Sequence, residues 1–265
     1  MKVLRSRENP AFKELQRVAA SSRERRSRGV TLLEGERLIG SYIESGGVPE
    51  MLAASESALK RDSLRRLFET SPAKARLVID DALLDRISQV VTASGVFAVA
   101  RAPAPSTLPD KLGDCLMLEN IQDPGNLGSM LRTAAAANVR QILLSHGSVF
   151  AWAPKVVRAG MGAHFHLDIH ENVDLAAAMR RATGEIVATL AHSDSVLHAC
   201  DLRGPVAWLF GNEGAGLSPG MADAATRRLA IPMPGAAESL NVAAAAAICL
   251  FEQVRQRTIP AKKGV

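Results

Sequence analysis

The sequence predicts a two-domain α/β protein whose second domain is built on a parallel β-sheet. The chain has 265 residues, which exceeds the roughly 100 to 200 residues of an average domain. Apolar residues make up 47% of the chain and charged residues 22%, so it can bury an ordinary hydrophobic core. Short apolar runs alternate with amphipathic segments, a pattern typical of a sheet covered by helices on both faces.

A proline-rich stretch marks the expected boundary between the two domains. Three prolines, the first at Pro103 and the last at Pro109, stand close to Ser106 and Thr107. This composition disfavours both helix and strand and is typical of an extended linker. We therefore predict a small α/β domain over residues 1–100, a linker over 101–113 and the sheet-based domain over 114–265.

The first domain is expected to begin with an amphipathic helix over residues 10–22. Asn9 followed by Pro10 is a helix start, and Phe12, Leu15 and Val18 recur at helical spacing. The basic residues of this segment then face outward. The predicted strands that follow cover residues 31–33, 51–54, 77–79 and 96–99, and the predicted helices cover 35–45, 64–69 and 82–88.

Residues 114–265 continue the alternation and supply the predicted parallel sheet. Turn-forming residues 123–125 follow the first apolar strand, and Asn126 is the expected N-cap of the next helix. Ser239 is the expected N-cap of the last helix. The predicted strands cover residues 115–119, 141–144, 165–169, 186–190, 206–210 and 228–231, and the predicted helices cover 127–137, 154–161, 174–182 and 239–257.

Basic residues are concentrated at the start of the chain. Residues 1–30 hold nine Lys or Arg and three Glu, a net charge of +6 that exceeds the +5 of the whole protein. Such a segment attracts polyanions by counterion release, so nucleic acid is the first partner to consider, although a solvated helix would have the same composition. The residues expected to bind nucleic-acid phosphates are Arg23, Arg25, Arg26 and Arg28.

Several classes of protein are disfavoured by the apolar runs and the cysteines. The longest uninterrupted apolar stretch, residues 242–251, is well short of the roughly 20 residues needed to cross a bilayer. Residues 1–12 lack the apolar core of a secretory signal. Cys115, Cys200 and Cys249 are odd in number and have no CxxC spacing, so we expect reduced, buried thiols. We therefore predict a cytoplasmic protein without a membrane segment.

Three histidines, His164, His166 and His170, raise the question of a metal site. An HxH pattern on a predicted strand would place two imidazoles on one face. No Cys or acidic residue is spaced to complete a ligand set, so no metal is expected. Lys155 and Arg158, on the helix just before, are predicted to contact nucleic acid instead.

The loops that follow three of the strands are the candidate site, because open parallel sheets bind ligands beyond the C-terminal ends of their strands. These loops begin after Glu119, Phe210 and Ile231. The second has a GxxGxG pattern, which matches neither a P-loop nor a dinucleotide-binding fingerprint. The pattern therefore argues against ATP hydrolysis and against a dinucleotide cofactor.

Three segments of this half of the chain carry a specific resemblance. In order they are NLGSMLRTA, FGNEGAGLS and IPMPGAAESLNVAAAAAI, and they resemble the three motifs of the SpoU (TrmH-type) RNA ribose 2'-O-methyltransferases of the SPOUT superfamily. The match covers residues 115–257. The leading segments RENPAFKELQRVAASSRERR and LLEGERLI resemble the L30e-like substrate-binding domain found in many of these enzymes. The resemblance implies a deep trefoil knot, S-adenosylmethionine as methyl donor and a homodimer.

The resemblance also implies five catalytic residues: Asn126, Arg132, Glu213, Ser239 and Asn241. Arg132 matches the family's candidate base. Because an arginine side chain keeps its proton, we expect Arg132 to orient the nucleotide phosphate and assist proton loss. Glu213 is expected to fix either Arg132 or the loop geometry. Helix capping by itself would account for Asn126 and Ser239, and both roles can coexist.

The cofactor is expected to lie in an apolar cleft with a few main-chain donors. The resemblance places the adenosine against Gly211, Ile231, Met233 and Leu240, with Thr189 or Leu190 as the opposite wall.

The expected function is methylation of the ribose 2'-hydroxyl of a nucleotide in structured RNA, with ribosomal RNA favoured over transfer RNA. A non-catalytic RNA-binding or ribosome-assembly protein that keeps the fold is the alternative. A related enzyme that methylates a base nitrogen is a third hypothesis. Residues 101–265 have a net charge of only +1. We therefore expect the first domain to capture RNA and the second to carry the chemistry.

Overall fold

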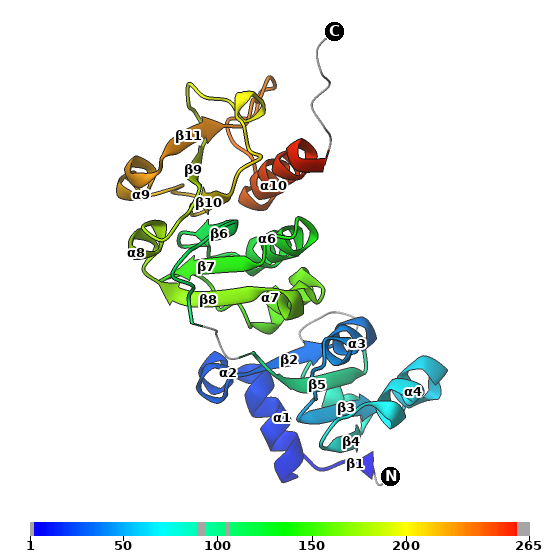
Figure 1. Ribbon diagram of the computed structural model, residues 1–265. Coiled ribbons are helices and arrows are strands. Elements are labelled where there is room, and N and C mark those ends of the chain that lie inside the picture. Colours follow the sequence, from blue (N-terminus) through cyan, green and yellow to red (C-terminus); the bar gives the residue numbers. More distant parts are fainter. Residues whose placement is uncertain (1–2, 89–93, 104–106, 259–265) are drawn as a thin grey trace. The chain divides into compact units, whose positions relative to one another are not determined.

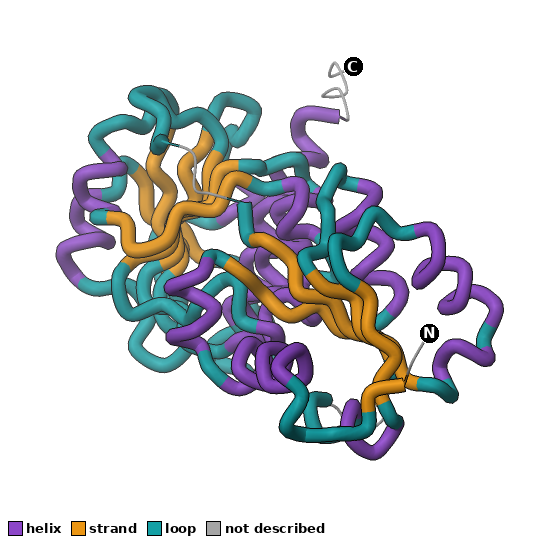
Figure 2. The backbone as a smooth tube through the Cα atoms, turned by 90° about the horizontal axis from the view of Figure 1, so that it is seen from below, coloured by secondary structure: helices purple, strands orange, loops and turns teal. Residues whose placement is uncertain are grey.

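The computed structural model describes residues 3–88, 94–103 and 107–258 (Figure 1). The chain divides into two compact units. Unit 1 comprises Met1–Ala104 and Trp152–Phe165, and unit 2 comprises Pro105–Ala151 and His166–Val265. Their strands form two separate sheets, drawn in orange in Figure 2. The predicted limits of the domains and linker stay a prediction, and residues 104–106 of that linker lie outside the described residues.

Unit 1 contains a five-stranded mixed sheet in the order β1-β4-β3-β5-β2. Strand β4 pairs in parallel with β1 and β3, whereas β5 pairs antiparallel with β3 and β2. The strands are β1 (Val3–Leu4), β2 (Val30–Glu34), β3 (Met51–Ser55), β4 (Arg76–Ile79) and β5 (Val96–Arg101). The helices are α1 (Pro10–Ala20), α2 (Ser22–Arg28), α3 (Glu36–Glu44), η1 (Ala58–Lys60), α4 (Asp62–Thr70), α5 (Asp81–Leu84), α7 (Pro154–Gly160) and η2 (Ala163–His166).

The first helix of unit 1 forms for the reasons that its sequence indicates. The Asn9 side chain accepts a hydrogen bond from the Ala11 N–H, and Phe12, Leu15 and Val18 are fully buried. Ser21 then ends α1 and caps a second helix, α2, which the sequence analysis did not predict. The basic segment is therefore a pair of helices.

Unit 2 contains a six-stranded, wholly parallel sheet in the order β11-β9-β10-β6-β7-β8. The strands are β6 (Cys115–Leu118), β7 (Gln141–Ser145), β8 (Asp168–Val173), β9 (Glu185–Leu190), β10 (Val206–Phe210) and β11 (Arg227–Ala230). The helices are α6 (Pro124–Ala136), α8 (Leu175–Met179), η3 (Leu197–Ala199), α9 (Pro219–Ala224) and α10 (Val242–Thr258). Strands β7 and β8 continue from one side of β6, while β10, β9 and β11 lie on its other side, so the order reverses between β6 and β10.

Helices cover both faces of this sheet, as the alternation predicts (Figure 1). Ala207 and Leu209 of β10 face a core shared with α8, and Met221 of α9 packs against the same core. Trp208 points to the other face, where its Nε1 donates to Gln253 of α10 at 2.8 Å. Helix α10 also packs on α6. No helix in the described part of the chain is both long and apolar enough to cross a membrane.

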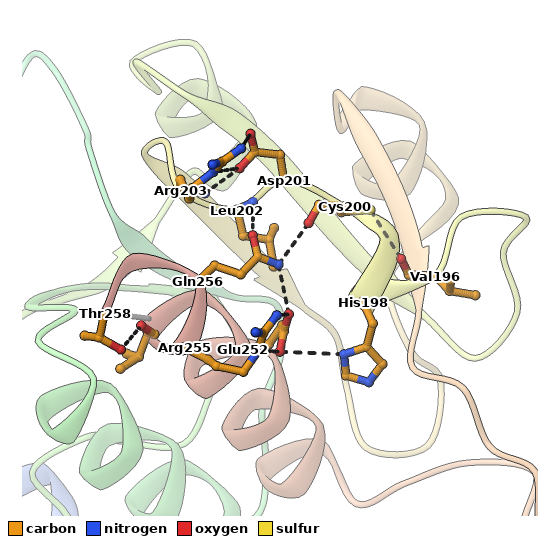
Figure 3. A network of polar contacts seen from close by, with 11 residues as sticks. Val196, His198, Cys200, Asp201, Leu202, Arg203, Glu252, Arg255, Gln256 and Thr258 are labelled. Carbon is orange, nitrogen blue, oxygen red and sulfur yellow. Dashed lines mark hydrogen bonds and ion pairs between the residues drawn. The ribbon is translucent and has the colours of Figure 1, made fainter. Parts of the chain in front are cut away.

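A polar network anchors the C-terminal end of α10 (Figure 3). Glu252 is buried and accepts two hydrogen bonds from Arg255, at 2.8 and 2.7 Å. These bonds lower the pKa of Glu252 to about 2. Gln256 accepts from the Leu202 N–H at 2.8 Å, and His198 Nδ1 lies 3.7 Å from the Glu252 carboxylate. The segment between β9 and β10 is thereby tied to α10.

The predicted strand over residues 165–169 is wrong. The chain forms η2 up to His166 and enters β8 only at Asp168, which pairs with Gln141 of β7. The aromatic ring of Phe165 instead packs on Tyr42, with ring centroids 5.2 Å apart. His164 and His166 therefore share a 3-10 helix, and the premise that an HxH pattern places two imidazoles on one strand face fails.

Candidate active site

A cavity of about 490 Å³ opens at the C-terminal ends of β9, β10 and β11. Its walls are the ends of β9 and β10 and the loops that follow β10 and β11. The structure brings together in this one cavity all six residues predicted to hold the cofactor: Thr189, Leu190, Gly211, Ile231, Met233 and Leu240. Two of the three loops chosen from the sequence therefore line the cavity directly.

The glycine pattern after β10 produces a loop that folds back on its own start. A Cβ at Gly211 would lie 2.2 Å from the backbone of Gly216 and Leu217, so only glycine fits. The Asn212 N–H donates to the Gly216 carbonyl at 3.0 Å, and the Gly216 N–H returns to the Asn212 carbonyl at 2.9 Å. The pattern thus closes a cavity wall instead of cradling a phosphate.

The loop after β11 forms the opposite wall and keeps its backbone donors open. No hydrogen bond links residues 232–240 to any other residue that the structure describes. The last main-chain hydrogen bond before this loop is at the end of β11, where the Ala230 N–H donates to the Ser195 carbonyl at 2.9 Å. The main-chain N–H groups of Met233 and Leu240 are therefore available to a ligand in the cavity.

Glu213 ties the loop after β10 to the loop after β6. Its carboxylate accepts from the Gln122 N–H at 3.2 Å, the Asp123 N–H at 3.0 Å and Asn126 Nδ2 at 3.2 Å. Partial burial raises the pKa of Glu213, but these hydrogen bonds outweigh it, so the pKa lies below its usual value. Glu213 is thus an ionised acceptor that fixes the loop geometry, and no hydrogen bond or ion pair joins it to Arg132 in the described part of the chain.

Asn126 is not the N-cap of α6, contrary to the prediction. Asp123 is the N-cap, and its side chain accepts from the Asn126 N–H at 2.7 Å. Proline at the first helical position makes the earlier start favourable. The Asn126 side chain is free of capping and accepts instead from Asn241 Nδ2 at 2.8 Å while donating to Glu213.

The last helix also starts later than predicted. It begins at Val242, and the Asn241 Oδ1 accepts from the N–H groups of Ala243 and Ala244, at 2.9 and 3.2 Å. Asn241 therefore takes the capping role expected of Ser239, because Ser239 lies on the cavity wall, before the helix. The motif asparagines and Glu213 form one chain of hydrogen bonds.

Arg132 stands apart from this chain. It is an exposed residue of α6, and it makes no hydrogen bond or ion pair with any residue in the described ranges. It is also absent from the cavity lining. Its guanidinium group is therefore available to a ligand that approaches from solvent.

Two of the arginines predicted to bind RNA are already engaged within unit 1. Arg25 is buried and donates to the carbonyls of Val18 and Ala19, at 2.7 and 2.9 Å, which satisfies the end of α1. Arg28 forms ion pairs with Glu14 and Glu24. Arg25 and Arg28 therefore already have partners within unit 1, and their role in RNA binding stays a prediction.

The remaining RNA candidates differ in exposure. Arg23 and Arg26 of α2 are exposed, as is Lys155 of α7. Arg158 lies 3.9 Å from the carboxylate of Glu34. Among the described residues there is no group of three His, Cys, Asp or Glu side chains that could hold a metal ion.

Sequence reasoning missed Asn120 and Asn212, which join the loops after β6 and β10. Asn212 Nδ2 donates to the Asn120 carbonyl at 2.8 Å. Asn120 has a left-handed backbone, with φ 54°. Each asparagine stands two residues after the end of a strand. This position is a turn signal, because an asparagine side chain binds nearby main chain and asparagine tolerates a left-handed backbone.

Comparison with known proteins places the chain among RNA methyltransferases. A model of the SpoU rRNA Methylase family matches residues 114–251. The chain is 30% identical over 257 residues to the 23S rRNA (guanosine(2553)-2'-O)-methyltransferase RlmP of Bacillus subtilis, covering 95% of this chain and 98% of that protein. It is 32% identical to the mitochondrial rRNA methyltransferase 3A of Danio rerio, covering 91% and 68%. The crystal structure of the SpoU methyltransferase AviRb from Streptomyces viridochromogenes, in complex with AdoMet, superposes with a TM-score of 0.82 at 28% identity, covering 96% of this chain and all of that one.

We predict that Gly211→Ala deforms the loop after β10 and lowers stability. The added methyl group would meet backbone at 2.2 Å, so the loop must move. Overpacking of this kind costs about 1 to 3 kcal/mol, which scanning calorimetry would detect as a lower Tm. Gly220→Ala is the matched control, because a Cβ at Gly220 of α9 meets nothing within 4 Å. An unchanged Tm for Gly211→Ala would contradict this reading of the loop.

Proposed function

Because the chain belongs to the SpoU rRNA Methylase family, we propose that it methylates the ribose 2'-hydroxyl of a nucleotide in structured RNA, with S-adenosylmethionine as methyl donor. Ribosomal RNA is the favoured substrate, since RlmP and the mitochondrial relative are named for it. One observation carries the proposal: the cavity formed by the predicted cofactor residues is bordered by Glu213 and Asn241, which hold Asn126.

The cavity fits the methyl donor in size and in chemistry. Its volume of about 490 Å³ is in the range of pockets for small cofactors, roughly 300 to 1,000 Å³. Phe210, Leu217 and Leu240 give it apolar surface, and the loop after β11 offers unused main-chain donors. When bound, S-adenosylmethionine supplies an electrophilic methyl group on a sulfonium ion.

The side chains around the cavity would position the substrate oxygen. Glu213 and Asn241 use one N–H and the carbonyl oxygen of the Asn126 amide, so one Asn126 N–H remains. Asn241 likewise keeps one N–H after binding Asn126. Both amides therefore present donors, which hold an oxygen atom in line with the methyl group and do not take its proton.

Arg132 would complete the arrangement from α6. Its guanidinium keeps its charge, so it binds the nucleotide phosphate and stabilises negative charge on the 2'-oxygen while solvent water accepts the proton of the hydroxyl group. The exposure of Arg132 and its lack of any partner among the described residues suit a group that acts only when RNA is present.

We expect Arg132→Ala to lower the rate of methyl transfer to RNA at least about 100-fold, because one preorganised charged donor contributes that much. Transfer of a labelled methyl group to total RNA would measure it. The affinity for S-adenosylhomocysteine, measured by calorimetry, should stay the same because Arg132 does not line the cavity. Arg140→Ala, which removes another exposed arginine, serves as the control.

The same experiments separate the alternatives. Full activity of Arg132→Ala on the true substrate would refute the assignment of Arg132. If the wild-type protein binds RNA but neither methyl donor nor its product, the non-catalytic alternative holds. Mapping of 2'-O-methyl groups in total RNA, with and without the gene, identifies the nucleotide and excludes or supports methylation of a base nitrogen.

We also propose a homodimer joined through α10. The helix has an uncovered small-residue and apolar stripe, with Ala244, Ala247, Ile248 and Phe251 at helical spacing. Phe251 is 47% exposed, which is unusual for a large aromatic side chain. The other side of α10 packs on α6 and Trp208.

Phe251→Glu should convert the protein to a monomer, because a charge buried in the interface at the end of the stripe would lack a partner. Light scattering would report the mass. Phe251→Leu keeps an apolar side chain and should remain dimeric. A stable, active monomer of the wild-type protein would rule out the dimer.

RNA capture is assigned to Arg23, Arg26 and Lys155 of unit 1, whose side chains are exposed. We expect the double variant Arg23→Glu and Arg26→Glu to weaken RNA binding and to reduce the salt dependence of log K by about two, since each phosphate contact releases about one counterion. Filter binding at several salt concentrations measures both. Equal loss in Arg65→Glu and Arg66→Glu, on α4 of the same unit, would show a general charge effect instead.

The remaining expectations stand as proposals. We propose an L30e-like fold for unit 1 and a trefoil knot at the C-terminal end of the unit 2 sheet, where the loops after β9, β10 and β11 gather around one cavity. The cytoplasm is the compartment we propose. The three free, buried cysteines support it.

A further inference from the structure

Asn212 commits every polar atom of its side chain to the protein. Its Oδ1 accepts from the N–H groups of Gly214 and Ala215, at 2.9 and 3.0 Å. Its Nδ2 donates to the Asn120 carbonyl at 2.8 Å and lies 3.4 Å from a Glu213 carboxylate oxygen. Asn212 is half-buried, and no hydrogen-bonding group is left over for a substrate.

The two ends of this side chain hold different parts of the site. Gly214 and Ala215 line the cavity that we assign to the methyl donor. Asn120 belongs to the loop after β6, which leads into Asn126 and supplies the N–H donors that hold Glu213. The Asn212 amide thus spans from the cofactor wall to the substrate-positioning chain.

Asn120 is built to receive this bond. Its backbone is left-handed, at φ 54°, and its N–H donates to Ser145 Oγ at 2.8 Å. This turn leaves the Asn120 carbonyl for the Asn212 Nδ2. The conformation costs energy for a residue other than glycine, so the turn depends on the contacts that hold it.

We propose that Asn212 is a positioning residue that couples the cofactor wall to the polar chain of Glu213, Asn126 and Asn241. Asn212 lines the cavity, but its polar side-chain atoms are all bound within the protein, so it acts through the two loops that it joins. The inference rests on the proposed function, because it takes the cavity to be the site of the methyl donor. Its consequence is that one side chain sets cofactor affinity and turnover together.

Replacing the Asn212 amide by a carboxyl group tests the role of the amide N–H donor separately from that of the amide oxygen. Asn212→Asp keeps an acceptor for Gly214 and Ala215 but loses the donor to Asn120, and it brings a second negative charge beside Glu213. When protonated, the introduced carboxyl group regains an O–H donor for the Asn120 carbonyl. The N–H groups of Gly214 and Ala215 favour the ionised form, whereas the Glu213 carboxylate and the Asn120 carbonyl disfavour it. We expect the second effect to be larger, so the pKa of the introduced carboxyl group should be raised above that of an ordinary aspartate.

The variant should therefore behave as the wild type at low pH. It should lose the hydrogen bond to the Asn120 carbonyl as the pH rises through that raised pKa. The charged and titratable groups around this position, on its own loop and on the loops packed against it, are Glu213, Asp123, Glu119 and His146. All four are unchanged in the variant. The pH dependence of the wild-type affinity therefore gives the contribution of these four groups.

The test is calorimetric titration of the full-length protein with S-adenosylhomocysteine between pH 5 and pH 8. For Asn212→Asp we expect affinity about tenfold below wild type at pH 8, the effect of one lost, partly buried hydrogen bond, with recovery toward pH 5. Asn212→Ala should be weak at every pH. Asn172→Asp, which adds the same charge at an exposed position on β8, should follow the wild type.

Methyl transfer at pH 8 provides the second readout, and kcat of Asn212→Asp should fall along with affinity. The inference is overturned if Asn212→Asp binds like wild type at pH 8, or if its weakness does not change with pH while calorimetric melting shows an intact fold. Failure of the wild-type protein to bind S-adenosylhomocysteine would instead overturn the proposed function, so the two failures are distinguishable.

Discussion

The ionised carboxylate of Glu213 is the group on which the rest of the candidate site depends. Main-chain donors of the loop after β6 converge on it, together with the amide of Asn126. Asn126 in turn holds Asn241, which caps α10. An apolar replacement would remove the acceptor that these donors share and would break the link between the loops. One charged side chain thus links the three loops of the site through hydrogen bonds.

The framework of this site was predictable from sequence, and its fine geometry was not. The run Val206–Phe210 contains only apolar residues, which is typical of a strand buried on both faces, and it forms β10. Asn126 was assigned to a helix cap because asparagine favours that position, but Asp123 stands three residues earlier, directly before proline. Local preference could not reveal that the Asn126 side chain has a partner 115 residues away, in Asn241. Contacts of that range depend on how the strands assemble.

The net charge of the basic segment did not reveal which of its arginines are free to bind a polyanion. The first 30 residues carry a net +6, yet Arg25 is spent on the carbonyls that end α1, and Arg28 is shared between glutamates. Desolvation lowers the pKa of Arg25, as burial of a cation requires. A basic segment can thus serve as the internal support of two short helices. Only exposure separates the arginines that can meet a polyanion from those that hold the fold.

The segment Trp152–Phe165 belongs to unit 1 although the chain reaches it only after β6, α6 and β7. Thr31 donates to the Trp152 carbonyl at 2.8 Å across 121 residues, and Tyr42 packs on Phe165. During synthesis on the ribosome, unit 1 must therefore wait for more than half of the chain to emerge before its last contacts can form. Its folding is tied to a large loop closure, which makes it slow compared with a domain of purely local contacts.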